Sequence, residues 1–197
     1  MAATAKTATL TIGAWAALPE DDEYELVDGK LAPAEMPSFV HEAVVLWLTR
    51  ILAAWAEEHA ARVYGSGGKF AVSASRGRQA DISVFFEGTR RPPARGACTT
   101  PADLLVEVVS SSPADGRRDR VEKLLEYAQF GVRFYWLVDP EERTFEIFER
   151  SAAGRYELAV AALGGRVDAV PGLVGCTLDI DALFRDVDAV IAESGGG

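Results

Sequence analysis

Apolar and polar positions follow a helical period most clearly between residues 38 and 60. Ser38 precedes this stretch and is expected to be its N-cap, and the apolar stripe comprises Val40, Val44, Trp47, Leu48, Ile51, Leu52 and Trp55. Shorter helices are predicted over 11–18 with Thr11 as the cap, from about Arg117 to Phe130 with Gly131 closing the helix, and from near Asp179.

Runs of β-type pattern fill most of the remaining chain. Residues 23–33 alternate around Asp28-Gly29, which predicts a hairpin. Further strands are expected at 62–64, 70–74, 81–86, 104–109, 133–139 and 144–150, a loop over 88–102, and a last β pair within 155–170. The mixture predicts one α/β domain with a central mixed sheet over residues 10–190, with flexible ends at 1–9 and 191–197.

Two strands carry a carboxylate that their apolar pattern does not explain. Glu107 shares one face of the strand 104–109 with Leu105 and Val109, and the other face is also apolar, which is typical of a central strand. A bare carboxylate there costs several kcal/mol unless a cation or a hydrogen-bond donor answers it. Asp81 begins the apolar run 81–86. If these strands are neighbours, the two acids converge near one end of the sheet.

Convergent carboxylates repel each other, and a hard divalent cation relieves that repulsion. Mg²⁺ is commonly held by one or two carboxylates, with water and phosphate oxygens completing its shell. Lys123, on the following helix, supplies a positive charge near such a site. These residue types together suit binding of a phosphodiester and activation of water.

Structural alternatives exist for each residue. Glu107 can pair with an arginine in the core, and Asp81 can be a turn residue at the start of its strand. Lys123 groups with Arg120 and Tyr127 on a helical wheel, away from Val121, Leu124 and Leu125, which is equally typical of a solvated lysine.

Charge and composition limit the ligands that the protein is expected to bind. The net charge of −10 opposes binding to phosphate overall, but residues 76–123 hold nine basic and seven acidic side chains, so this window is +2 and the rest of the chain −12. The arginines of the window are either solvated or a basic rim around a site.

Cys98 and Cys176 are expected to be free thiols, and with two histidines a His-rich metal site is excluded. Without a secretory signal or an apolar run of membrane length, we expect a cytoplasmic protein without a membrane partner.

Several segments of the sequence resemble the Uma2 family (DUF820) of endonucleases, which has the PD-(D/E)XK, restriction-endonuclease-like fold. The matching segments span about residues 11–185 in family order: YELVDGKL, FVHEAVVLWL, RQADISVFF, DLLVEVVSSSPADGRRDRVEKLLEYAQFGVRFYWLVDP and VPGLVGCTLDIDALF. The resemblance implies an α/β fold with a restriction-endonuclease-like core, a central mixed β-sheet and flanking helices.

The resemblance also implies roles for individual residues. Asp81 matches the metal-binding aspartate and Glu107 the acid of the (D/E)XK half-motif, with the carbonyl of Val108 as a further metal ligand. The position two residues after Glu107 is Val109, so the lysine would come from the next helix as Lys123. Ala80 replaces the proline of the motif, a change that removes no reactive group.

Three further residues match positions near the family's site, each with an ordinary structural interpretation beside it. Glu25 matches a recurrent acid but can equally be a cross-strand hairpin residue. His41, in the first turn of the long helix, can aim at the site or serve in capping. Tyr127 can pack in the core or touch the lysine or the substrate.

The function expected from the resemblance is a Mg²⁺- or Mn²⁺-dependent endonuclease that hydrolyses DNA, with a homodimer expected by analogy. The net charge favours a competing interpretation, a nuclease-fold binding or scaffold protein that does not cleave. A hydrolase of a phosphodiester other than DNA is the third interpretation.

Overall fold

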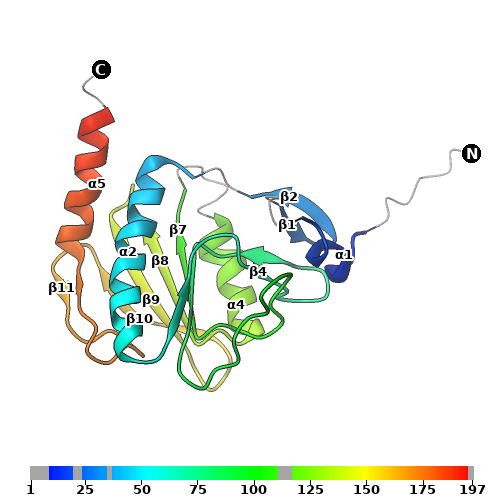
Figure 1. Ribbon diagram of the computed structural model, residues 1–197. Coiled ribbons are helices and arrows are strands. Elements are labelled where there is room, and N and C mark those ends of the chain that lie inside the picture. Colours follow the sequence, from blue (N-terminus) through cyan, green and yellow to red (C-terminus); the bar gives the residue numbers. More distant parts are fainter. Residues whose placement is uncertain (1–8, 20–23, 35–36, 111–116, 195–197) are drawn as a thin grey trace, which may run out of the picture.

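A six-stranded mixed sheet forms the centre of the computed structural model, which describes residues 9–19, 24–34, 37–110 and 117–194 (Figure 1). Of the adjacent strand pairs within this sheet, only β7–β8 is parallel. The strand order is β10 (Tyr156–Ala162), β9 (Thr144–Arg150), β8 (Phe134–Asp139), β7 (Leu104–Val108), β6 (Ile82–Phe85) and β3 (Arg62–Tyr64). The predicted mixed α/β architecture is confirmed.

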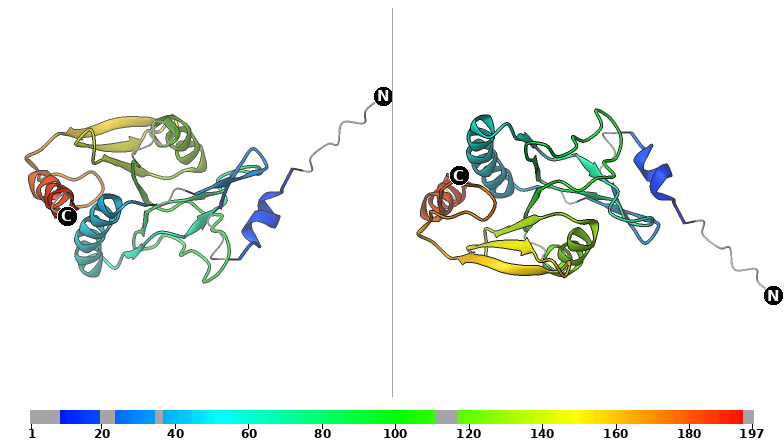
Figure 2. Two further views of the ribbon diagram at one scale, coloured as in Figure 1. Left: turned by 90° about the horizontal axis from the view of Figure 1, so that it is seen from above. Right: turned by 90° about the horizontal axis from the view of Figure 1, so that it is seen from below.

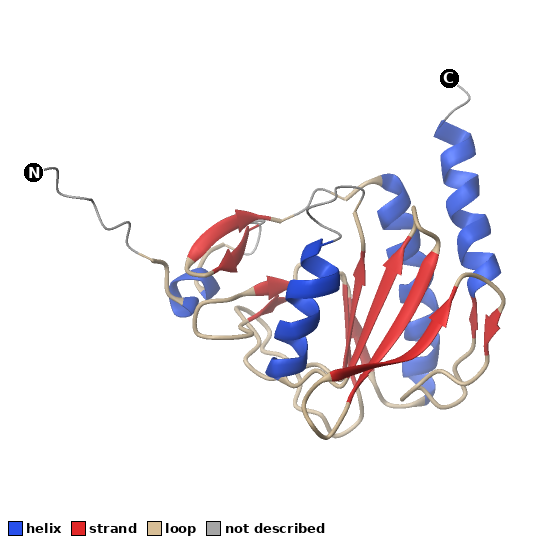
Figure 3. Ribbon diagram, turned by 180° about the vertical axis from the view of Figure 1, so that it is seen from behind, coloured by secondary structure: helices blue, strands red, loops and turns tan. Residues whose placement is uncertain are grey.

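Helices cover both faces of this sheet. Helices α2 (Phe39–Glu58) and α5 (Ile180–Ser194) lie side by side on one face, and α4 (Leu124–Phe130), with the π-helical turn η1 (Arg118–Lys123) before it, covers the other (Figures 2 and 3). The side chains of β7 alternate between two cores as expected. Val106 packs in the core on the α2 side, and Leu105 packs with Tyr127 of α4 in the other.

Helix α2 is long and apolar enough, by length and composition, to cross a membrane, a property that the sequence pattern did not predict. Its apolar stripe nevertheless lies against the sheet, where Val44, Leu48 and Leu52 are fully buried. Ser38 caps the helix as predicted, because its Oγ accepts a hydrogen bond from the His41 amide at 3.1 Å. Helix α2 is therefore a core helix of this domain, and its first turn is fixed in orientation.

A small lobe beside the sheet carries the hairpin predicted at residues 23–33. Strands β1 (Tyr24–Val27) and β2 (Lys30–Pro33) are joined by Asp28 and Gly29, both at positive φ, as a two-residue type I′ turn requires. The hairpin pairs through Leu26 and Gly77 with the segment before β5 (Arg78–Gln79), which pairs in turn with β4 (Lys69–Phe70).

Trp15 seals this lobe. It lies on α1 (Ile12–Ala16), is fully buried, and donates from Nε1 to the Tyr24 carbonyl at 2.7 Å. A Cβ at Gly77 would lie 2.3 Å from the Trp15 ring, so only glycine allows the hairpin, β5 and α1 to meet. Trp15 thereby holds α1, the hairpin and the segment before β5 together, and Glu25 of the hairpin is buried.

Two predicted β segments were wrong. Residues 156–162 and 166–167 do not pair with each other: β10 pairs with β9 across a short turn, and β11 (Arg166–Val167) pairs with β12 (Leu178–Asp179). The pairing with β9 uses the whole length of β10, from Tyr156 to Ala162, whereas β11 has only two residues to pair. The strand expected at 70–74 ends at Phe70, because the Ser73 amide donates to the Arg76 carbonyl in a turn.

The predicted helix 117–130 begins with the π-helical turn η1 and ends at Gly131, whose φ is +107° as expected for a closing glycine. The terminal helix continues to Ser194, beyond the expected domain boundary at 190. Residues 1–8 and 195–197, which make up most of the predicted flexible ends, lie outside the described residues.

Two glycines with nearly the same φ test how tightly the core is packed. Gly172 (φ +77°) has the buried Phe134 ring 2.1 Å from where a Cβ would stand, whereas Gly175 (φ +79°) has nothing within 4 Å. Both alanine variants carry the same backbone strain, so we expect Gly172→Ala to lower the free energy of unfolding by about 1–3 kcal/mol more than Gly175→Ala. Urea denaturation measures this difference, and equal losses would contradict the packing described.

Candidate active site

Asp81 and Glu107 meet where β6 begins and β7 ends, at one edge of the central sheet formed by strand ends, because of the register of these two antiparallel strands. Ile82 of β6 faces Val106 of β7, so the residue before Ile82 and the residue after Val106 lie at the same end. The Val108 amide donates to Asp81 Oδ2 at 2.7 Å. The convergence predicted from the two strands is therefore observed.

The buried carboxylate of Glu107 has a lysine and a tyrosine as partners. Lys123 Nζ lies 2.8 Å from Glu107 Oε2, and the Tyr127 hydroxyl donates to Oε1 at 2.6 Å. All three residues are at most 5% exposed. The alternative of a core arginine paired with Glu107 is wrong, and so is a solvated Lys123.

The π-helical turn η1 brings Lys123 to this position together with an acid that the sequence analysis missed. Asp119 is buried, and its Oδ1 lies 3.0 Å from Lys123 Nζ. Val121 and Leu125, on the face that the helical wheel assigned to the core, are at least half exposed. The helix thus packs its polar face inward, where Lys123 pairs with the buried Glu107. π-Helical turns recur at functional sites.

Glu25 closes the site from the hairpin. Its Oε2 accepts from Arg78 Nη1 at 2.6 Å, and its Oε1 lies 3.8 Å from Lys123 Nζ. Arg78 is fully buried and also binds Glu126 of α4 through two nitrogens, at 2.7 and 2.9 Å. This bidentate pair links the hairpin to the helix that carries Lys123.

His41 contacts the site from the first turn of α2. Its Nε2 lies 3.2 Å from Asp81 Oδ2, and its Nδ1 lies 3.5 Å from Glu42. Burial lowers the pKa of His41, but Asp81 and Glu42 outweigh it, so the pKa lies above its usual value. Besides its place in the capped turn, His41 therefore provides a proton-dependent contact to Asp81.

A cavity of about 220 Å³ opens over these groups. All the predicted site residues except Tyr127 line it, joined by Asp119 and Arg118. Tyr127 lies behind Glu107, in contact with that carboxylate. The cavity therefore contains acids from a hairpin, two strands and a helix.

Carboxylates outnumber cations among the fully buried groups of the site: Glu25, Glu107 and Asp119 face Lys123 and Arg78, and Asp81 adds a half-buried acid. Burial, followed by the nearby acids, holds the pKa of Glu107 well above its usual range in spite of Lys123. Burial also raises the pKa of Asp119. For Lys123, burial acts downward, but Glu107, Asp119 and Glu25 raise its pKa well above the usual value.

The donor atoms at this edge suit a hard divalent cation. No three His, Cys, Asp or Glu side chains form a ready-made metal site within the described ranges, so a cation would rely on the two carboxylates and a backbone oxygen. The amide and carbonyl of one strand residue point to the same side, so the Val108 carbonyl faces the side of Asp81. Each Glu107 oxygen retains acceptor capacity beyond its present bond. Together with the excess of buried acid, these groups fit Mg²⁺ or Mn²⁺.

Four of the eight arginines of window 76–123 are bound to acids or backbone carbonyls and form no basic rim, whereas Arg90, Arg95 and Arg117 are exposed and Arg118 lines the cavity. Arg76 and Arg78 bind acids of the hairpin and of α4, and Arg120 binds Asp139 and Glu146. Arg91 donates to the carbonyls of Phe85 and Ala60. The sequence could have indicated Asp119 as a site residue, because it precedes Lys123 by four positions on one helix. The local pattern around the buried Arg78 contains no such indication.

Comparisons with known proteins place this geometry in a family. The crystal structure described as "a putative nuclease belonging to DUF820" from Anabaena variabilis superposes with a TM-score of 0.70 at 20% identity, covering 90% of this chain and 99% of that one, which shows a shared fold. No curated protein matches the chain. The family model Uma2, described as "Putative restriction endonuclease", matches residues 13–181. The chain therefore belongs to the Uma2 family.

Proposed function

We propose that this protein is a metal-dependent nuclease that hydrolyses phosphodiester bonds of DNA at the cavity formed by Asp81, Glu107 and Lys123. The observation that carries the proposal is the β6–β7 register, which sets two carboxylates side by side with a lysine 2.8 Å from one of them. A purely structural core has no need for this excess of buried acid beside an open cavity.

Asp81, Glu107 and the Val108 carbonyl would hold the cation. When bound, Mg²⁺ or Mn²⁺ supplies Lewis acidity toward a phosphate oxygen and toward water. The Val108 amide and His41 both fix Asp81 Oδ2, so this carboxylate is oriented before the cation arrives. Tyr127 does the same for Glu107. Pre-oriented ligands reduce the reorganisation that binding requires.

Lys123 supplies a permanent positive charge. Its raised pKa keeps the ammonium protonated at neutral pH, so it does not serve as a general base. It stabilises negative charge that develops on the phosphate and neutralises Glu107 and Asp119 when the cation is absent. Glu25 and Asp119 position the amine from two sides.

The competing function is a nuclease-fold binding protein that does not cleave. The net charge of −10 and the ion pair of Lys123 with Glu107 favour it. Such a protein gains no stability from Mg²⁺ or Mn²⁺, whereas a nuclease with this site does. Cleavage rates of DNA and of phosphodiesters without deoxyribose, measured in the same assay, show which of the two is the substrate.

The first test removes the two carboxylates. We expect Glu107→Gln and Asp81→Asn to lower Mn²⁺-dependent DNA cleavage by at least about 100-fold, because both hold the cation. The rise in melting temperature on adding Mn²⁺ should also disappear. Glu57→Gln, an exposed acid of α2, is the matched control and should behave as the wild type. A Glu107→Gln variant that cuts DNA at the wild-type rate would remove the proposal.

The second test separates the charge of Lys123 from the metal ligands. We expect Lys123→Gln to reduce cleavage by about 10²–10³-fold, while Mn²⁺ still binds. Without the cation the variant leaves buried acids uncompensated, which costs about 3–5 kcal/mol of stability. Mn²⁺ should therefore raise the melting temperature more in the variant than in the wild type. Lys30→Gln, on the exposed edge of the hairpin, is the control; an equal Mn²⁺ response in all three proteins would count against this role.

The third test uses pH. Because the pKa of His41 is raised above 6.5 by Asp81 and Glu42 against the effect of burial, its ion pair stabilises the fold below pH 6.5 and is lost as pH rises through the raised pKa. The stability difference between wild type and His41→Gln should be larger at about pH 5 than at about pH 8. His59→Gln, which removes the other histidine, is the control. A pH-independent difference, measured by urea denaturation, would contradict the His41–Asp81 pair.

A further inference from the structure

A second and larger groove continues from the catalytic cavity. It has a volume of about 1170 Å³ and lies between the end of α1, the β3–β4 connection and the loop after β6. Ser66 and Gly67 line both the groove and the catalytic cavity. A chain lying in the groove therefore has a direct route to the acids.

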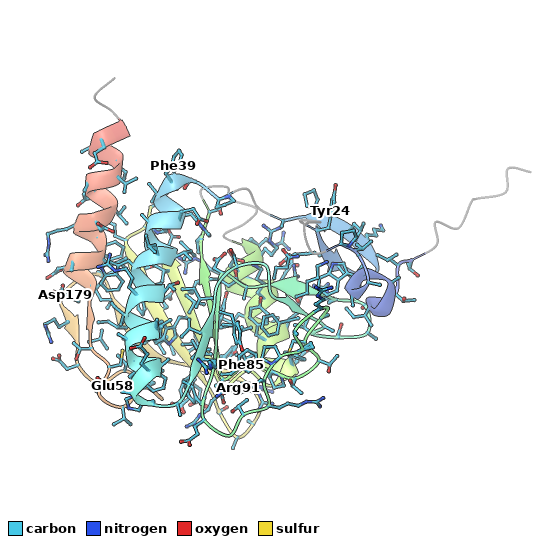
Figure 4. The ribbon with its side chains drawn as sticks, viewed as in Figure 1. Tyr24, Phe39, Glu58, Phe85, Arg91 and Asp179 are labelled. Atoms are coloured by element: carbon cyan, nitrogen blue, oxygen red, sulfur yellow. The ribbon has the colours of Figure 1, made fainter. Side chains whose placement is uncertain are left out.

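The charge of the groove differs from that of the whole protein. Its described lining includes two cationic residues, Lys69 and Arg95, and no Asp or Glu, although the chain carries a net charge of −10. Arg95 is exposed on the loop after β6. The loop itself is anchored, because Arg91 donates to the Phe85 and Ala60 carbonyls, and Figure 4 shows Arg91 beside Phe85. The groove suits an anionic ligand.

Lys69 strengthens this assignment because its buried ammonium is held by neutral groups. It is 5% exposed, and its Nζ donates to the Leu18 and Pro19 carbonyls at 3.1 and 2.9 Å. Within the part of the chain that the structure describes, the hydrogen bonds of Nζ go to these two neutral carbonyls and none goes to a carboxylate. A buried cation without a counter-ion is stabilised by a bound anion.

Tyr64 gives the groove an exposed aromatic ring. Its ring is 41% exposed and is held edge-on against the buried Phe85, with centroids 5.8 Å apart. Bases of a single strand stack on such rings, whereas bases in a duplex are already stacked on one another and turn only their edges outward. The ring thus favours an unpaired strand over a duplex.

Three glycines of the β3–β4 connection line the groove and leave backbone uncovered there. Residues 65–68 read Gly-Ser-Gly-Gly, and a Cβ at Gly65 or Gly67 would meet nothing within 4 Å. Open backbone lets a sugar–phosphate chain approach the amides closely. Cations, an aromatic ring and bare backbone are the features that bind single strands without sequence preference.

We propose that this groove binds a single-stranded nucleic acid and leads it to the catalytic cavity, so that the enzyme acts on unpaired strands. The inference rests on the proposed nuclease function. Tyr64 stacks on a base, the exposed Arg95 contacts a phosphate, and the buried Lys69 adds positive potential along the groove. Ser66 and Gly67 mark the junction where the strand enters the cavity.

The test is fluorescence anisotropy of wild-type protein in EDTA with labelled oligothymidine and with a duplex of the same length. We expect the single strand to bind more tightly than the duplex. Tyr64→Ala should weaken single-strand binding about tenfold. Arg95→Ala should reduce the slope of log affinity against log salt by about 0.7, the value for one phosphate contact on a single strand.

Matched controls come from residues outside the groove. Tyr24 is 40% exposed on the hairpin and Arg155 is exposed on the turn before β10, so Tyr24→Ala and Arg155→Ala should leave single-strand binding unchanged. Tighter duplex binding, or equal effects of Tyr64→Ala and Tyr24→Ala, would overturn the groove assignment. Groove-dependent binding without cleavage would contradict the nuclease proposal alone, and cleavage without groove-dependent binding would contradict this inference alone.

Discussion

The burial of more carboxylates than cations at one edge of the sheet is the constraint on which the site depends. Each acid removed from water costs free energy unless a cation or a hydrogen-bond donor compensates its charge. Lys123 forms ion pairs with Glu107 and Asp119, and Arg78 forms one with Glu25. Three buried acids face two buried cations, and burial raises the pKa of Glu107 and of Asp119 in spite of Lys123, so this compensation is incomplete. A divalent cation at the same edge would complete it, which connects stability to the proposed catalysis.

The fold provides this arrangement with rigid elements. The β6–β7 register sets Asp81 beside Val108, and the capped first turn of α2 brings His41 to Asp81. The hairpin is held by Trp15 and by the Arg78–Glu126 pair, so Glu25 approaches from a third direction. Groups fixed by strands, a helix and a hairpin lose little entropy when a ligand binds, as a catalytic site requires.

Much of this arrangement could be predicted from the sequence, for reasons that differ between residues. A carboxylate in a strand apolar on both faces indicates a buried acid, and this argument found Glu107; Asp81 was found as the acid that begins the neighbouring apolar run. Helical periodicity pointed the wrong way for Lys123, because it assumes that the polar face of a helix meets water. The resemblance to the Uma2 family, which rests on a whole segment rather than on one helix, set Lys123 beside Glu107, and the structure has it there. Arg78 and the pairing of β10 depend on contacts between distant segments, which local patterns do not contain.

A crystal soaked in Mn²⁺ and measured at a wavelength where manganese scatters anomalously tests the central claim most directly. The account predicts one strong anomalous peak within bonding distance of Asp81, Glu107 and the Val108 carbonyl, with Lys123 Nζ moved away from its present position 2.8 Å from Glu107. The absence of a peak at a Mn²⁺ concentration that supports cleavage, with the Lys123–Glu107 pair intact, would contradict it.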